Sequence, residues 1–283
     1  MQNHDSSKEI SSQEIPLGKQ VEYPSQYQPE LLFPVARQLK RDEIDIQGQL
    51  PFHGTDIWNA YELSWLNSKG KPQVAIAVFE FDCASTNIIE SKSFKLYLNS
   101  LNQTRFADWQ SVEKTLTDDL SKAAETAVSV KLFKVEDYNQ AVPVKEWQGV
   151  LLDELDIEID GYQYQPELLA LESNEVVTES LYSHLLKSNC LITSQPDWAS
   201  ILIEYKGPKI DQASLLKYLI SFRNHNEFHE QCVERVFTDI MSHCKPLELT
   251  VYARYTRRGG LDINPWRSNV SGKVCSNQRH SRQ

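Results

Sequence analysis

The chain has 283 residues, of which 40% are hydrophobic, and this is enough for one large or two ordinary folded domains. Its formal net charge of -10 at pH 7 argues against general affinity for nucleic acid, because a phosphate backbone has to be met by Lys and Arg. No apolar run approaches the roughly 18 residues of a membrane span, and the polar residues 1–7 lack the apolar core of a signal peptide. We therefore expect a cytoplasmic protein that binds neither nucleic acid nor a membrane.

The first half of the chain predicts an extended arm followed by an α+β module. Residues 1–33 are rich in Ser, Gln, Glu and Pro and predict an N-terminal arm with little regular structure. In the N-terminal module, which we place at 34–149, alternating and apolar patterns predict strands, and apolar positions at spacing four predict helices. Asp108 is the expected cap of the second helix. The predicted elements are strands at 57–66 and 73–81, helices at 90–102 and 108–127, and a strand at 128–135.

The C-terminal module, placed at 150–283, repeats this plan. Gly207-Pro208 is expected to end one of its strands, since these two residues commonly break regular structure. The predicted elements are strands at 157–164, 176–186 and 198–206, helices at 211–223 and 228–244, and a strand at 247–255.

Identical residues support a duplication. Nine identical pairs fall at a fixed offset of 121 without a gap, among them Tyr97 with Tyr218, Ser100 with Ser221 and Asp118 with Asp239. Two unrelated helical hairpins could share amphipathic composition, but periodicity does not require identity at polar positions. The sequence therefore favours two copies of one α+β unit.

A polar loop at 188–198 carries one thiol, Cys190, and one carboxylic acid, Asp197. A thiolate is a good nucleophile and a nearby carboxyl group can supply a proton, so the pair suits covalent chemistry on an electrophilic carbon. The alternative is a half-buried small hydrophobe beside a turn residue. The first copy has no such pair, which indicates that the halves have specialised and that a site lies at the seam between copies or subunits.

Three further stretches carry groups suited to ligands. Residues 90–95 lie at the mouth of a predicted helix and suit an anionic group, unless Glu90 merely satisfies the helix dipole. Glu230 can accept two N–H donors from a guanine-like edge and His229 can transfer a proton, with helix capping as the alternative. The stretch 254–260 holds three arginines and two glycines, and suits either a phosphate clamp or an exposed turn.

Some signatures are absent. The sequence lacks the glycine-rich motifs of Rossmann and P-loop nucleotide sites and the His-Glu-x-x-His zinc motif. The cysteines are odd in number and never form a Cys-x-x-Cys pair, so we expect free thiols and no metal site. They are Cys83, Cys190, Cys232, Cys244 and Cys275.

Together these motifs resemble the long, two-module form of the NADPH-dependent 7-cyano-7-deazaguanine reductase family, the nitrile reductases of queuosine biosynthesis. The matching stretches are ESKSFKLYL at 90–98, the loop at 188–198, FHE at 228–230 and YTRRGGLD at 255–262. The resemblance runs from about residue 50 to residue 266. It implies a tunnelling fold, or T-fold, in which tandem duplicated units assemble antiparallel sheets and paired helices into barrels, with purine-like ligands at the seams.

The resemblance also implies a reaction. Cys190 would attack the nitrile carbon of 7-cyano-7-deazaguanine (preQ0) to give a covalent thioimide, Asp197 would donate a proton, and two hydrides from NADPH would give the 7-aminomethyl product, preQ1. A homodimer is implied because the barrel has to close. The residues implied for the substrate are Ile89, Glu90, Ser91, His229 and Glu230, and those for NADPH are Ser91, Lys92, Arg258 and Gly259.

Two other classes of function remain open. One is another T-fold enzyme, such as a pterin or GTP-ring-opening hydrolase, which would normally need a metal. The other is a non-catalytic purine-binding or RNA-associated module, which fits poorly with the acidic charge and the pairing of Cys190 with Asp197.

Overall fold

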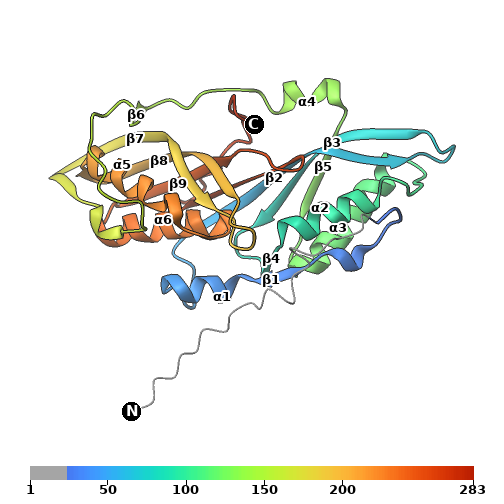
Figure 1. Ribbon diagram of the computed structural model, residues 1–283, viewed down its shortest axis with the longest axis horizontal. Coiled ribbons are helices and arrows are strands. Elements are labelled where there is room, and N and C mark those ends of the chain that lie inside the picture. The colour runs from blue at the N-terminus through green and yellow to red at the C-terminus, as the bar shows by residue number, and fades with distance from the viewer. Residues whose placement is uncertain (1–23) are drawn as a thin grey trace, which may run out of the picture.

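One antiparallel-rich sheet of eight strands runs through residues 24–283, the part of the chain that the computed structural model describes (Figure 1). The order across the sheet is β5-β3-β2-β10-β9-β8-β7-β6, and β1 pairs separately with β4. The strands are β1 Pro34–Ala36, β2 His53–Leu66, β3 Pro72–Asp82, β4 Asn87–Ile89, β5 Ser129–Phe133, β6 Val150–Leu151, β7 Leu171–Asn189, β8 Pro196–Ile210, β9 Glu248–Tyr255 and β10 Leu261–Ser268. The α-helices are α1 Arg37–Arg41, α2 Ser91–Ser100, α3 Trp109–Ala124, α4 Val135–Ala141, α5 Gln212–Ser221 and α6 His229–His243. The prediction of a mixed α+β fold is confirmed.

The first module follows the predicted order of elements. Strands β2 and β3 form the expected hairpin, α2 and α3 follow, and β5 pairs with β3. Asp108 caps α3 as predicted: its side chain accepts a hydrogen bond from the Ser111 amide, and the Ser111 hydroxyl accepts one from the Asp108 amide. The short strands β1 and β4 and the helices α1 and α4 were not predicted.

The predicted break at Gly207-Pro208 was wrong, because β8 continues through both residues to Ile210. The pairing of β8 with β9 ends at Lys206, so no bond on that side of the strand needs the missing N–H of Pro208. Gly207 is needed for a close approach, since a Cβ there would lie 2.6 Å from Cα of Pro246. Both residues therefore fit inside β8, because its pairing with β9 has already ended while its pairing with β7 continues.

Two other predictions for the second module need correction. The segment 157–164 contains no strand. Strand β10 was missed, because Asn264-Pro265 reads as a loop. Pro265 is tolerated since it lies where β10 pairs with β2 but no longer with β9.

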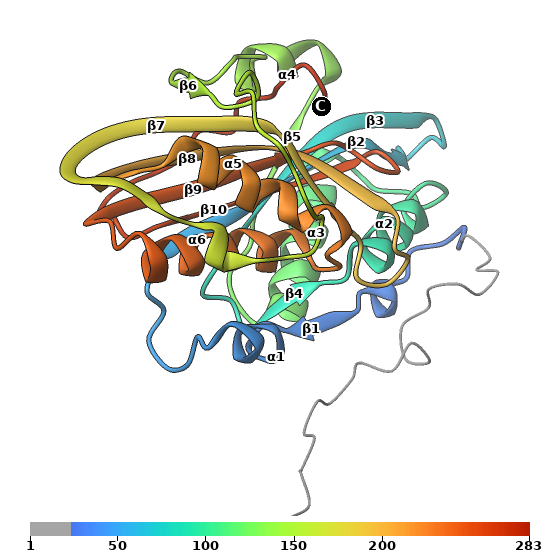
Figure 2. The same cartoon turned by 60° about the vertical axis from the view of Figure 1, so that its left-hand side comes forward.

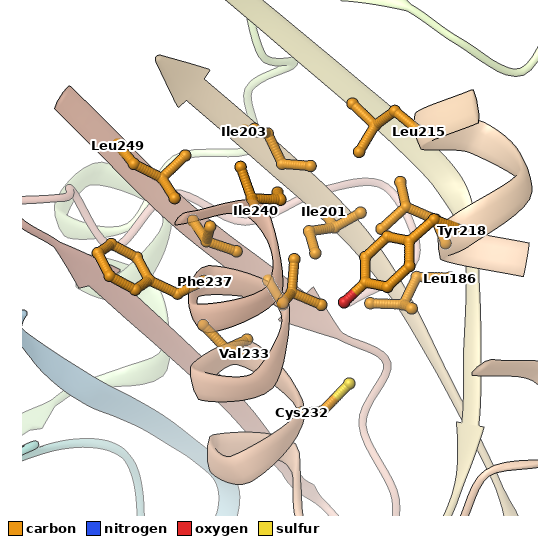
Figure 3. Close-up of a cluster of buried hydrophobic side chains, with 14 of the residues drawn as sticks. Leu186, Ile201, Ile203, Leu215, Tyr218, Cys232, Val233, Phe237, Ile240 and Leu249 are labelled. Atoms are coloured by element: carbon orange, nitrogen blue, oxygen red, sulfur yellow. The ribbon is translucent and has the colours of Figure 1, made fainter. Parts of the chain in front are cut away.

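Strand β10 joins the two halves of the molecule. It pairs with β2 in register from Leu261 opposite Ala60 to Ser268 opposite His53. The second half of the chain thereby continues the sheet of the first, and α2, α3, α5 and α6 lie on the same face (Figure 2). Figure 3 shows the core under the second pair of helices, where side chains of α6 and α5 meet β7, β8 and β9. The labelled residues are Leu186, Ile201, Ile203, Leu215, Tyr218, Cys232, Val233, Phe237, Ile240 and Leu249.

The opposite face of the sheet is covered by α4, by the segment that follows it and by residues 269–283 (Figure 1). A separate aromatic cluster forms beneath them, in which Tyr138 and Trp147 pack against Tyr252 of β9 and Trp266 of β10. Strands β2, β9 and β10 thus bury side chains on both faces, which explains why their sequences lack a simple alternation.

Matching tyrosine contacts tie each copy of the unit together. Tyr27 and Tyr97 both donate hydrogen bonds to Asp119 in the first copy. In the second copy, Tyr164 and Tyr218 both donate to Asp239. The same hexapeptide, YQPELL, begins with the first tyrosine of each pair, and it lies at 27–32 and 164–169. Residues 24–33 of the predicted arm are therefore ordered against α2, while residues 1–23 lie outside the described part of the chain.

These contacts correct the register of the repeat in its second helix. Helices α2 and α5 begin 121 residues apart, at Ser91 and Gln212, as the identities indicated. Helices α3 and α6 begin 120 residues apart, because the connection is 101–108 in one copy and 222–228 in the other. Asp239 therefore corresponds to Asp119 rather than to Asp118.

Five charged side chains are buried together where the halves meet. Arg267 of β10 contacts Asp56 of β2 and Glu234 of α6, at 2.8 and 2.9 Å. Arg37 also pairs with Asp56, and Arg41 with Glu234, at 2.5 and 2.7 Å. Removal of one partner from a buried pair typically costs about 3–5 kcal/mol, because the other charge is left without compensation. We call these five residues the seam cluster.

In residues 24–283, no helix is long and apolar enough to span a bilayer.

Candidate active site

A cavity that is partly open to solvent lies between the two halves, at the N-terminal ends of α2 and α6. It is lined by most of the residues that the sequence singled out. The lining residues are Trp58, Ile89, Glu90, Ser91, Cys190, Asp197, Glu227, Phe228, His229, Glu230, Arg258 and Ile263. The first half of the chain thus supplies one wall and the second half supplies the thiol, the acid and the arginine.

Cys190 follows the last residue of β7 and begins a tight turn. Its amide donates to the Gln195 carbonyl at 2.8 Å, and its carbonyl accepts from the Ser194 amide at 3.0 Å. Burial raises the pKa of the half-buried thiol, but hydrogen bonds from Thr193, from the Ile192 amide and from Arg258 outweigh it. The net pKa lies below the ordinary value for cysteine, which favours the reactive thiolate.

Asp197 lies near the start of β8 with only 3% of its surface exposed. One carboxylate oxygen is 3.2 Å from Nε2 of His229, and the other is 2.9 Å from Nε of Arg258. Burial raises the pKa of Asp197, but His229, Arg258 and Lys95 together hold it below the ordinary range. Without substrate, Asp197 is therefore held as a carboxylate between the imidazole of His229 and the guanidinium of Arg258.

His229 is the first residue of α6 and stacks flat on Tyr255, the last residue of β9. The two ring centroids are 3.7 Å apart and the ring planes are parallel. Because Nε2 faces Asp197 and one ring face is covered by Tyr255, the orientation of the imidazole is fixed from two sides. Tyr255 was expected only as part of a strand and as the first residue of the matching stretch at 255–262, and its contact with His229 was not predicted.

Glu230 follows His229 in the first turn of α6 and is 5% exposed. Burial raises its pKa to about 7, and the negative charge of Asp56 adds to the effect. The seam cluster therefore acts on this wall of the cavity, since Asp56 belongs to it. A carboxyl group poised near neutrality can accept hydrogen bonds from a ligand once it is ionised.

Glu90 serves the helix as well as the cavity. Its carboxylate caps α2 by accepting hydrogen bonds from the amides of Lys92 and Ser93, at 2.9 and 2.7 Å. Glu90 therefore caps α2 and also lines the cavity, and its carboxylate has further lone pairs to offer. Ile89 and Ser91 also line the cavity, whereas Lys92 does not.

A second, larger cavity that is also partly open to solvent adjoins the turn between β9 and β10. Its lining residues are Ala60, Glu62, Lys95, Leu98, Asn99, Asn102, Gly259, Gly260 and Leu261. Gly259 and Gly260 have φ values of 55° and 71°, which glycine adopts without strain. Lys95 approaches both cavities: its chain passes Gly259, and burial, aided by the charge of Arg258, lowers its pKa.

Sequence reasoning missed several lining residues. Trp58 and Ile263 lie within buried strands, and Lys95 lies on a helix without a pattern that would single it out. Glu227 and Phe228 adjoin the His229-Glu230 pair, and that adjacency was the available signal. Glu227 is buried, and one of its oxygens pairs with Arg235 at 2.6 Å.

Three polar atoms of the lining are buried without a hydrogen-bond partner among the described residues: Trp58 Nε1, Glu227 Oε2 and His229 Nδ1. Buried polar groups are nearly always paired, so these atoms indicate a ligand or ordered water in the first cavity. No group of three or more His, Cys, Asp or Glu side chains in residues 24–283 has the arrangement of a metal site. All five cysteines are free, as predicted.

Comparison with known proteins places the chain in a family. Residues 23–132 match the model "Nitrile reductase, 7-cyano-7-deazaguanine-reductase N-term", and residues 196–273 match "QueF-like protein". A relative from Chromobacterium violaceum is 56% identical, covering 95% of this chain and 96% of its own. One from Cupriavidus taiwanensis is 58% identical, covering 95% and 98%. Both are named NADPH-dependent 7-cyano-7-deazaguanine reductase. The chain belongs to this family.

The reductase family match is longer than the motifs indicated, since it covers 95% of the chain rather than residues 50 to 266 alone. It extends into residues 24–33 and beyond β10. A solved structure, the archaeosine synthase QueF-Like in the apo form, aligns with 37% of this chain at 19% identity, with a TM-score of 0.30.

We predict that Arg258→Ala raises the pKa of the Cys190 thiol, because the thiolate loses a cationic partner. Alkylation of Cys190 by iodoacetamide should then require higher pH than in the wild type. Mass spectrometry of the modified peptide across a pH series measures this shift.

The matched control is Arg257→Ala, since Arg257 stacks over the Tyr61 ring at 4.2 Å and lines neither cavity. An alkylation profile that does not move in Arg258→Ala, or that moves equally in both variants, would contradict the assignment.

Proposed function

We propose that the chain reduces the nitrile of preQ0 to the aminomethyl group of preQ1 with NADPH, through a covalent adduct on Cys190. The observation that carries the proposal is that the thiol, Asp197 and Glu230 line one cavity, although the chain separates them by up to forty positions. The names of relatives that match nearly the full chain support the substrate and the cofactor. Metal-dependent ring opening has no comparable support from the described residues.

Adduct formation needs a nucleophile and a proton. The Cys190 S–H bond breaks, its sulfur bonds to the nitrile carbon, and the nitrile nitrogen gains one proton, which gives a thioimide. Asp197 is a carboxylate in the free site, so it can take the thiol proton and then donate it to the nitrogen. These two transfers account for the proton that leaves the thiol and reaches the nitrogen. They also reconcile the lowered pKa of Asp197 with its predicted role as a donor, because Asp197 first takes up the proton that it later donates.

The deazaguanine ring would lie against α6 and the start of α2. Glu230, once ionised, can accept two N–H donors from the amidine edge of the ring, as a planar bidentate pair. His229 and the 89–91 segment would complete the binding site from the two halves. Trp58 Nε1 and Glu227 Oε2, which have no hydrogen-bond partner among the described residues, offer further partners to a polar heterocycle.

Residues around the second cavity fit an anionic dinucleotide. Lys95 and Arg258 supply positive charge beside Gly259 and Gly260, whose backbone leaves room for close approach. Ser91 adjoins the first cavity and Lys92 the same helix end. NADPH bound there would supply one hydride, so two NADPH molecules in turn, together with two protons, would be needed to take the thioimide to the amine and release the Cys190 thiol.

We further propose that two copies of the tandem T-fold unit assemble as a cytoplasmic homodimer, with modules at 34–149 and 150–283. The outer edge of β7 supports this, because within residues 24–283 only Leu181 and Tyr182 pair with β6 and Asn189 with Asn226, which leaves most of this 19-residue strand without a strand partner on that side. Such an edge is suited to pairing with another sheet. Barrel closure would protect it.

We predict that Cys190→Ala loses NADPH-dependent turnover by on the order of a thousandfold or more while still binding preQ0, because the covalent step is lost and Glu230 remains. The wild type should consume two NADPH for each preQ0. Spectrophotometric NADPH oxidation and calorimetric binding measure the two quantities. Cys275→Ala is the control, since Cys275 is also only partly buried but lies on the opposite face of the sheet. Turnover by Cys190→Ala at the wild-type rate would exclude the mechanism.

We also predict that preQ0 binds more tightly as pH rises through 7, because the ligand needs the ionised form of a carboxyl group whose pKa is raised to about 7. In a Cys190→Ala background, affinity should be about tenfold weaker at pH 6 than at pH 8. Glu230→Gln should bind weakly and without this dependence. If Glu230→Gln keeps the same pH profile, another group is responsible.

A further inference from the structure

The two strands behind the histidine of the cavity separate before they reach it. Strands β9 and β10 pair only from Thr250 opposite Ser268 to Tyr252 opposite Trp266. Tyr255, which stacks on His229, lies three residues beyond the last of these pairs. Its N–H and C=O on the β10 side therefore have no partner in a strand ladder and need one elsewhere.

Two side chains take the place of the missing ladder. Asn264 of β10 accepts a hydrogen bond from the Tyr255 amide through Oδ1, at 3.1 Å. Gln283 donates through Nε2 to the Tyr255 carbonyl at 2.8 Å and to Oδ1 of Asn264 at 2.7 Å. Tyr255 is thus held at both backbone groups by side chains, one of which comes from the last residue of the sequence.

Gln283 reaches this position from the face of the sheet opposite the helices, where Figure 1 marks the C-terminus. Its Oε1 accepts from Nε of Arg254 at 2.9 Å and from the His280 amide at 3.2 Å. The side chain is buried and both ends of its amide are satisfied. A glutamine fixed by four hydrogen bonds has one orientation, so it transmits a defined position to the strand.

We propose that Gln283 is a positioning residue for the His229–Asp197 pair, acting through Tyr255. The chain of contacts is continuous: Gln283 holds the Tyr255 backbone, the Tyr255 ring covers the His229 face, and Nε2 of His229 lies 3.2 Å from Asp197. The inference rests on the proposed function for its catalytic meaning. Its geometric part, the orientation of His229, stands independently.

Two variants separate positioning from general anchoring of the tail. Gln283→Glu keeps an acceptor for Arg254 but loses both donor bonds, to Tyr255 and to Asn264. Arg279→Ala removes a tail contact elsewhere: the Arg279 guanidinium lies over the Tyr138 ring at 5.1 Å and contacts Asn139 of α4. Only the first of these changes touches the support of Tyr255.

The first readout is the NMR signal of the His229 ring in protein labelled with 13C at histidine, assigned with His229→Gln. Stacking at 3.7 Å should shift its ring protons upfield through the Tyr255 ring current, and Tyr255→Leu should abolish the shift. Gln283→Glu and Gln283→Ala should both reduce it, whereas Arg279→Ala should leave it unchanged. An unchanged signal in Gln283→Glu would overturn the proposal.

The second readout is the rate of adduct formation with preQ0 in the absence of NADPH, measured together with the melting temperature. We expect Gln283→Glu to slow this step on the order of tenfold, because a small displacement of a reacting group is costly. Arg279→Ala should react at the wild-type rate even if it melts earlier. An equal slowing in both variants would make the tail a general stabiliser and overturn the proposal. If the wild type forms no adduct, the proposed function fails, and the NMR comparison still decides the positioning claim.

Discussion

The structure depends on the burial of Arg267 between two carboxylates from different halves of the chain. Asp56 comes from β2 and Glu234 from α6, and Arg267 lies on β10, the strand that joins the two halves of the chain. Arg37 and Arg41 complete the seam cluster from a helix that precedes both. Since charges in a protein interior are tolerated only when paired, these five groups fix the halves in one relative position.

The geometry of the first cavity depends on the seam cluster. Glu230 lies one helical turn from Glu234, so the turn of α6 that faces the cavity is held by the same ions that join the halves. The charge of Asp56 contributes to the raised pKa of Glu230, while Arg258 and His229 lower that of Asp197. The pKa values of these two carboxyl groups thus move in opposite directions, because burial and the charge of Asp56 raise that of Glu230, whereas the contacts with His229 and Arg258 lower that of Asp197.

Much of this could be predicted from the sequence, and the failures have physical reasons. The thiol, the acid and the His229-Glu230 pair lie in short polar stretches, so their chemistry was visible. Trp58 and Tyr255 act from buried strands, where a functional side chain and a core side chain have the same pattern. Strand β10 was hidden by Pro265, whose tolerance depends on where a neighbouring strand ends. The one-residue shift between the repeated second helices was detected only in the structure, from the bounds of α3 and α6 and from the tyrosine contacts of Asp119 and Asp239.

The central claim is that Cys190 forms a covalent bond with the nitrile, and intact mass tests it most directly. Wild-type protein incubated with preQ0 and no NADPH should gain the full mass of the nitrile, because addition releases no leaving group. Cys190→Ala should gain nothing, and NADPH added afterwards should return the wild type to its original mass. No mass gain in the wild type, or an equal gain in Cys190→Ala, would contradict the account.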